Sequence, residues 1–137
     1  MTVQEKIAIA HNVMAFGPFS ASNLAATQSD QAAALPATNT SVAMPIGGSV
    51  VGITGKLSAA ATAGTLLVGV TVDGVEDADS VQTITTLAEF YASFQEGQIP
   101  FSAGANIGIE WNTDGDWNGT GSDIDVYVLV LLKDMEF

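Results

Sequence analysis

IDVYVLVLL, residues 124–132, alternates in a way that decides the fold class of this 137-residue chain. One set of alternate positions is wholly apolar: Ile124, Val126, Val128, Val130 and Leu132. The other set begins with Asp125 and then becomes apolar, with Tyr127, Leu129 and Leu131. Successive side chains of a β-strand point to opposite faces, so the pattern predicts a strand with one buried face and a second, mostly apolar face. Such a strand lies either in the middle of a packed sandwich or at a subunit interface.

Three other segments alternate with the same period of two. Residues 66–72 (LLVGVTV) place four apolar side chains on one face. In residues 50–57 the predicted buried face carries Val51, Ile53 and Leu57, and in residues 107–111 it carries Ile107, Ile109 and Trp111, with Glu110 opposite. Fainter strands are predicted at 6–13, 41–46, 80–87 and 89–94. Together these segments predict an all-β chain: a single-domain antiparallel β-sandwich or jelly-roll-like barrel of about eight strands.

The alternation is concentrated after residue 40, which sets the expected domain organisation. Residues 41–137 are expected to form the β-sandwich core. Residues 1–40 are expected to supply an N-terminal strand and an extended arm or loop, because 20–40 is rich in Ala, Ser, Thr and Gln. We expect one domain overall, with the arm reaching onto a neighbour.

Composition excludes several classes of partner. The chain has 15 acidic and 3 basic residues, a net charge of −12. Three cations cannot neutralise a row of phosphates, and an anionic membrane surface would repel the chain, so we expect neither nucleic acid nor membrane as a partner. There is no cysteine, and therefore no disulfide or thiolate metal site. The N-terminus does not resemble a signal peptide, and no apolar run is long enough to span a membrane.

The loop before the last strand, NTDGDWNGTGSDID (112–125), matches the spacing of a calcium loop. The candidate ligands are Asp114, Asp116, Asn118, the Thr120 carbonyl and Asp125. Three features favour a plain turn instead. Strands rather than helices flank the loop, its twelfth residue is the shorter Asp, and Trp117 and Gly121 suit a hairpin. We therefore expect no cofactor, with calcium as the alternative.

Exposed aromatic residues such as Trp111, Trp117 and Tyr91 could stack on sugars. Trp111, however, shares a face with two isoleucines and is expected in the core, so Trp117 is the better candidate for a contact with sugar or protein. A second acidic segment, DGVEDAD (73–79), predicts a solvated turn.

Catalysis has little support in the sequence. The one histidine, His11, shares an apolar face, where it is more often a hydrogen-bonded core residue than a base. There is no cysteine nucleophile and no G-x-S-x-G motif. Glu89, Glu96 and Glu110 could form a glycosidase pair, but nothing in the sequence brings two of them together. The sequence therefore predicts a protein that is not an enzyme.

Three blocks carry a resemblance to a known family: AMPIGGSVVGITGKLSAAATAGTLLVGVTVDGV (43–75), FSAGANIGIEWNTDGDW (101–117) and SDIDVYVLVLL (122–132). The motifs are M-P-x-x-G-S-V-V-G, T-A-G-T-L-x-V-x-V-T-V-x-G, F-x-A-G-x-x-I-G-I and D-I-D-V-x-V. In this order and spacing they resemble β-domains of virion proteins of tailed bacteriophages, among them head-decoration and fibre proteins. In that family the loop before the last strand commonly lacks the Asp-rich spacing found here.

The resemblance implies an all-β sandwich that assembles as a homotrimer and attaches to a capsid or tail. Its implied function is a capsid decoration (cement) protein on the virion surface, bound to the major capsid protein. Tyr127, Leu129 and Leu131 would then lie in the trimer interface, because a monomer would leave them exposed. The alternatives are a head-fibre or tail-fibre subunit for host contact, or a calcium-dependent carbohydrate-binding module that uses Trp117.

Overall fold

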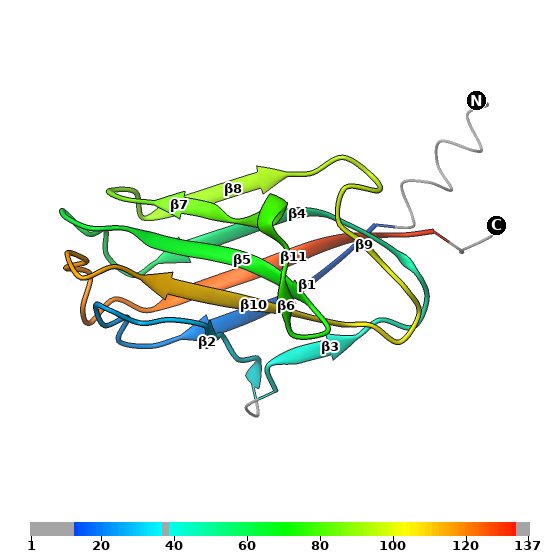
Figure 1. Ribbon diagram of the computed structural model, residues 1–137, viewed down its shortest axis with the longest axis horizontal. Coiled ribbons are helices and arrows are strands. Elements are labelled where there is room, and N and C mark those ends of the chain that lie inside the picture. The colour runs from blue at the N-terminus through cyan, green and yellow to red at the C-terminus, as the bar shows by residue number, and fades with distance from the viewer. Residues whose placement is uncertain (1–12, 37–38, 134–137) are drawn as a thin grey trace.

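The computed structural model of the chain describes residues 13–36 and 39–133, and it is an antiparallel all-β sandwich (Figure 1). Sheet A has the order β1 (Val13–Ala21), β11 (Ile124–Leu132), β4 (Gly48–Leu57) and β8 (Glu89–Ser93), with β9 (Pro100–Phe101) also paired to β4. Sheet B has the order β2 (Gln31–Ala32), β10 (Asn106–Thr113), β5 (Leu66–Val72) and β6 (Val75–Glu76). In sheet B, β3 (Ser41–Ala43) also pairs with β10, and β7 (Gln82–Ile84) pairs with β5. The predicted fold class is confirmed.

The core lies between the two sheets and is built from alternate positions of the long strands. On β11 the buried residues are Ile124, Val126, Val128, Val130 and Leu132, as the sequence predicted. Sheet B contributes Val68, Val70, Ile107 and Ile109 from its own inner face. Trp111 is also buried, as expected. Each fully buried aliphatic side chain of this kind contributes about 1.5–3 kcal/mol relative to exposure.

The predicted face of β4 is wrong at Val51. A β-bulge shifts the register between β4 and β11, so that Leu129 pairs with Gly52 whereas Val130 pairs with Val50. A bulge inserts one extra residue into a strand and thereby reverses the alternation beyond it. Val50 is consequently buried in the core and Val51 is only half-buried, while Ile53 and Leu57 lie inside as predicted.

The fainter strands are shorter than predicted. The described residues contain eleven strands rather than about eight, because five of them have only two or three residues. The segment predicted as one strand at 80–87 instead begins in a 3₁₀-helix, η2 (Ala78–Ser80). There the buried Ser80 hydroxyl accepts from the Val70 N–H at 2.7 Å, a local hydrogen bond that takes the place of strand pairing.

Much of the segment expected as an arm is folded onto its own chain. Leu24 and Ala33 are fully buried, and β2 pairs with β10. The Leu24 N–H donates to the Ser122 carbonyl at 3.0 Å, and the Thr27 N–H to the Asp114 carbonyl at 3.0 Å. Residues 20–36 therefore belong to the sandwich rather than to a free arm.

The predicted strand at 6–13 and the interpretation of His11 fall on residues 1–12, which lie outside the described residues. In the described part, β1 begins at Val13. None of the helices in residues 13–36 and 39–133 is long and apolar enough to cross a membrane.

Candidate functional site: the outer face of sheet A

The outer face of sheet A carries an apolar surface made by β1 and β11. Val13 pairs with Leu131 and Ala15 with Leu129, so each pair points to the same side of the sheet. That side is the outer one, because Val130 and Leu132 on either side of Leu131 are buried in the core. We call Val13, Ala15, Tyr127, Leu129 and Leu131 the outer stripe.

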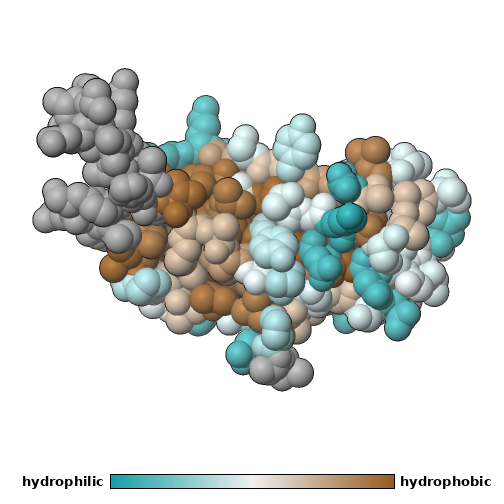
Figure 2. Space-filling view, turned by 180° about the vertical axis from the view of Figure 1, so that it is seen from behind, coloured by the Kyte–Doolittle hydropathy of each residue, from teal (hydrophilic) through white to brown (hydrophobic). Residues whose placement is uncertain are grey.

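The outer stripe is only partly covered in the single chain. Val13 is 45% exposed and Tyr127 is 43% exposed, while Leu129 and Leu131 are half-buried. Leu129 packs over Gly52 of the neighbouring strand β4, where a Cβ would lie 3.7 Å from the Leu129 Cβ. Figure 2 views this side of the molecule and shows hydrophobic residues gathered towards one end of it. None of the five residues is charged, although the chain carries a net charge of −12.

Towards the other end of the same face, two tyrosines stand on either side of one threonine. Thr54 of β4 pairs with Tyr127 of β11 and with Tyr91 of β8, so the three side chains share the outer side of the sheet. Tyr91 is 86% exposed. These residues border a shallow hollow of about 400 Å³, which Lys56, Glu89 and Asp125 also line. The surface therefore passes from apolar, through aromatic, to charged.

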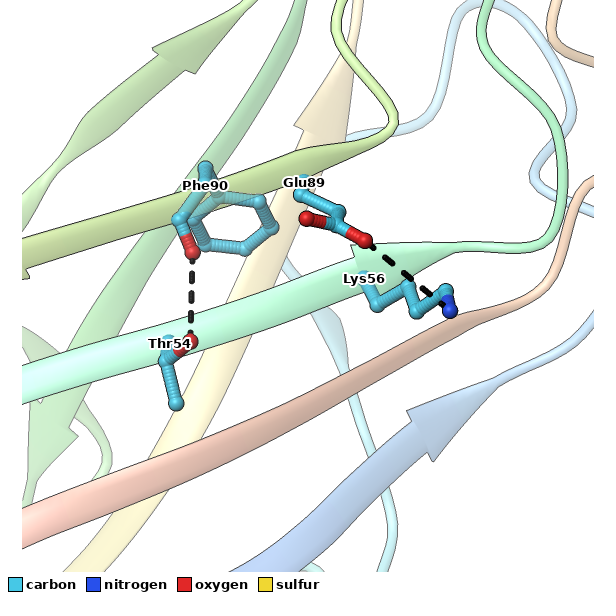
Figure 3. A network of polar contacts seen from close by, with 4 residues as sticks. All are labelled: Thr54, Lys56, Glu89 and Phe90. Atoms are coloured by element: carbon cyan, nitrogen blue, oxygen red, sulfur yellow. Dashed lines mark hydrogen bonds and ion pairs between the residues drawn. The ribbon is translucent and has the colours of Figure 1, made fainter.

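The polar groups of this hollow are loosely held. The Lys56 amine lies 3.9 Å from a Glu89 carboxylate oxygen, and both side chains are largely exposed (Figure 3). An exposed ion pair of this kind contributes little to stability. The Thr54 hydroxyl donates to the Phe90 carbonyl at 3.4 Å, a long hydrogen bond (Figure 3). Asp125 accepts a hydrogen bond from the Ser20 hydroxyl of β1.

The predicted calcium ligands are not gathered around one point. Asp114 accepts from the Thr65 and Asp116 N–H groups, each at 3.1 Å, and so uses one oxygen to hold the loop to the neighbouring turn. The Asn118 side-chain oxygen likewise accepts from the Thr62 N–H at 2.9 Å and from the Ala63 N–H at 3.0 Å. Asp125 lies apart from the loop, on the outer face of β11. Asp116 and Thr120 are exposed.

Within residues 13–36 and 39–133, no group of three or more His, Cys, Asp or Glu side chains is placed to hold a metal ion. The visible role of the loop's polar side chains is to join two turns of the sandwich.

Trp117 was expected on the surface, and this expectation is wrong. The side chain is 3% exposed, and its indole N–H donates to the Leu24 carbonyl at 3.0 Å. Gly64 and Gly119 make room for it, because a Cβ on Gly119 would lie 2.3 Å from the indole ring. Trp117 closes one end of the core and offers no platform to a sugar.

Of the three glutamates considered for catalysis, Glu89 and Glu110 lie on opposite sides of the molecule. Glu89 is on the outer face of sheet A, and Glu110 is on the outer face of sheet B. The structure instead brings Glu110 together with Glu76 of β6, and the sequence had placed Glu76 in a solvated turn. The Glu76 carboxyl lies over Gly69, the residue of β5 that pairs with Glu110, and Glu110 helps to raise the pKa of Glu76.

Sequence reasoning missed Val13 and Ala15. Alternation through VMAF (13–16) could have found both, because Met14 and Phe16 pack against the core on the other face. Tyr91 is exposed, as the sequence predicted, but its place beside Thr54 depends on the pairing of β8 with β4.

No protein-family model matches the chain, and no curated protein matches it. Among solved structures, the chain is similar to a capsid asymmetric unit of cyanophage Pam1, with 16% identity and a TM-score of 0.47 over 89% of this chain and 86% of that one. It is also similar to the coat protein dimer of Tobacco streak virus, with 11% identity and a TM-score of 0.40 over 93% of this chain and 89% of that one. At such scores neither likeness defines what this chain does.

Proposed function

We propose that the protein is a structural virion protein: a homotrimeric capsid decoration (cement) protein that binds the outer surface of a phage head and stabilises the shell. The observation that carries the proposal is the outer stripe, an uncharged and partly exposed surface on an otherwise acidic chain. Surfaces of this kind are found where a subunit meets another protein.

The charge of the chain favours contact between copies through this stripe. Each chain contributes −12, so copies repel one another wherever their acidic surfaces meet. The uncharged stripe is where two copies approach at the smallest electrostatic cost, and burial of its leucine and valine side chains supplies the attraction. Association through β1 and β11 also covers the free edge of β1, which in the described residues makes only an isolated bridge to Ala34.

The sequence resemblance adds support of a different kind. Its blocks fall mainly on β4 and β5, then on β10, and finally on β11. These strands make up the central part of both sheets, so the resemblance concerns the whole scaffold. The proposed partner is the major capsid protein, and the proposed location is the capsid surface of the virion.

The test uses phage heads from which the protein has been removed. Adding back the wild-type protein should saturate the heads and raise the temperature at which they burst. The Leu129→Lys variant should fail to do so, because a lysine in the stripe prevents trimer formation. Leu87→Lys is the matched control, since Leu87 is a large exposed apolar residue outside the stripe, 64% exposed. Heads that are equally stable with and without the wild-type protein would reject the cement role.

A second candidate function, contact with host glycans, is favoured by the Tyr91–Tyr127 hollow. Tyrosine rings stack on the apolar faces of sugars, and Thr54, Lys56 and Glu89 offer donors and acceptors beside them. Trp117 is no longer part of this hypothesis, because it is buried. Saturable binding of a neutral oligosaccharide that Tyr91→Ala abolishes would favour this function. If the protein binds no member of a glycan panel, capsid decoration remains the proposed function.

A further inference from the structure

Two acidic side chains meet on the outer face of sheet B, across one strand. Glu110 of β10 pairs with Gly69 of β5, and Glu76 of β6 pairs with Thr71 of β5. Because Gly69 has no side chain, Glu76 lies over the backbone of β5. A Cβ on Gly69 would come within 2.9 Å of the Glu76 Oε2 and 3.0 Å of its Cδ. Glu76 thereby reaches across β5 to Glu110.

The surroundings of Glu76 are poor in compensating groups. Its Oε2 atom is buried and has no hydrogen-bond partner among the described residues. The charged groups that act on it are Glu110 from β10 and Asp30 from the turn before β2, and both are acids. The two lysines of the described residues belong to sheet A, where Lys56 lies on β4 and Lys133 follows β11.

These surroundings favour a bound proton. Burial, the hydrogen bond with Glu110 and the negative charges of Glu110 and Asp30 together raise the pKa of Glu76 to about 7 from the ordinary 4.5. Two carboxyl groups in contact can form a hydrogen bond only when one of them carries a proton to donate. Without that proton, two like charges lie side by side and repel each other.

We propose that Glu76 and Glu110 form a proton-operated latch, which fastens β6 to sheet B while the pair shares a proton and loosens it when both carboxyl groups are ionised. β6 is suited to this role because it has only two residues, paired at Thr71–Glu76 and Val72–Val75. The turn that precedes it, Asp73–Gly74, has positive φ at both residues, 52° and 81°. Its two ends are tied to the neighbouring strands by backbone groups: the Asp77 N–H donates to the Val70 carbonyl at 2.9 Å, and the Asp73 N–H donates to the Asn106 carbonyl at 2.8 Å.

The latch also borders a hollow. Asp30 and Glu110 line a depression of about 380 Å³ together with Asp73 and Gly74 of the β5–β6 turn. Loosening of β6 acts on the turn that forms one wall of this depression, although Asp73 of that turn stays hydrogen-bonded to Asn106. A change of pH is thereby converted into a change of shape on the face opposite the outer stripe.

The direction of the pH effect follows from the proton balance. Between pH 4.5 and about 7 the folded chain keeps a proton on the pair that the unfolded chain has lost. Stability therefore falls as the pH rises through this window and levels off above it. This behaviour is independent of any capsid.

The experiment is a carboxyl ¹³C NMR titration of the full chain, with melting temperatures measured from pH 4.5 to 8.5 in the presence of chelator. We expect the Glu76 carboxyl to titrate near 7 and the melting temperature to fall across the window. Glu76→Gln supplies a permanent amide donor to Glu110. The melting temperature of this variant should therefore stay constant across the window and should be higher than that of the wild type at pH 8. Asp30→Asn should lower the Glu76 midpoint.

The matched control is Glu89→Gln, because Glu89 is a largely exposed glutamate on the other sheet. Its melting temperature should fall with rising pH as that of the wild type does. A Glu76 carboxyl that titrates near 4.5, or a fall in melting temperature that Glu76→Gln leaves unchanged, would overturn the proposal. Because the NMR midpoint is read in the wild type, the proposal stays testable even if a variant fails to fold.

Discussion

The indole N–H of Trp117 donates a hydrogen bond of 3.0 Å to the carbonyl oxygen of Leu24, 93 residues earlier in the chain. This contact ties the loop before β11 to the segment that follows β1, and both partners are buried. A loop residue and a residue of a supposed arm thus turn out to be parts of one core.

Substitution of Trp117 should therefore affect folding rather than binding. Trp117→Ala should cost about 3–5 kcal/mol of unfolding free energy, as loss of a buried aromatic side chain usually does. Trp117→Phe keeps most of the packing but leaves the Leu24 carbonyl without its donor, and it should cost less. Urea unfolding followed by circular dichroism measures both. A Trp117→Ala variant as stable as the wild type would contradict the placement of the side chain.

The calcium loop gives a prediction in which two neighbouring aspartates differ. Asp114→Ala removes an acceptor of two backbone hydrogen bonds and should cost about 1–3 kcal/mol. Asp116→Ala, at an exposed position whose side chain makes no such contact among the described residues, should stay within about 0.5 kcal/mol.

Melting curves with calcium and with chelator complete this test. If the loop is only a turn, the melting curves with calcium and with chelator should be the same. If it is a calcium site, the ion would bind the folded state and raise the melting temperature. A calcium-dependent rise that Asp116→Ala abolishes would restore the metal-site hypothesis.

Gly55 and Phe90 form a pair whose coupling can be measured. A Cβ on Gly55 would lie 2.2 Å from the Phe90 Cζ, so the ring occupies the space that the glycine leaves on the inner side of β4. Gly55→Ala should cost about 1–3 kcal/mol through overpacking. In a Phe90→Ala background the same change should be nearly neutral. Additive costs in the double-mutant cycle would show that the ring does not depend on Gly55.

The sequence was a good guide where one regular pattern governed a whole strand. The inner residues of β11, β5 and β10 follow a strict period of two, and all three strands lie where the pattern placed them. The pattern failed at Val51, because a bulge depends on the partner strand and leaves no mark on hydrophobic alternation.

The polar positions were harder to predict, for a different physical reason. Trp117 and Glu76 both sit in polar segments, and local composition indicates exposure for each. Their surroundings come from residues distant in sequence, Leu24 for the buried tryptophan and Glu110 for the half-buried glutamate. The outer stripe was found only in its β11 part, because its β1 part became visible through the pairing of the two strands.

The central claim is that the outer stripe joins copies of this chain, and sedimentation equilibrium tests it most directly. The wild-type protein at micromolar concentration should give a mass of three times the 14.0 kDa chain. Leu129→Lys should give the mass of one chain with its circular dichroism unchanged, while the control Leu87→Lys should remain a trimer. A wild-type protein that sediments as a monomer, or a Leu129→Lys variant that remains a trimer, would contradict the account.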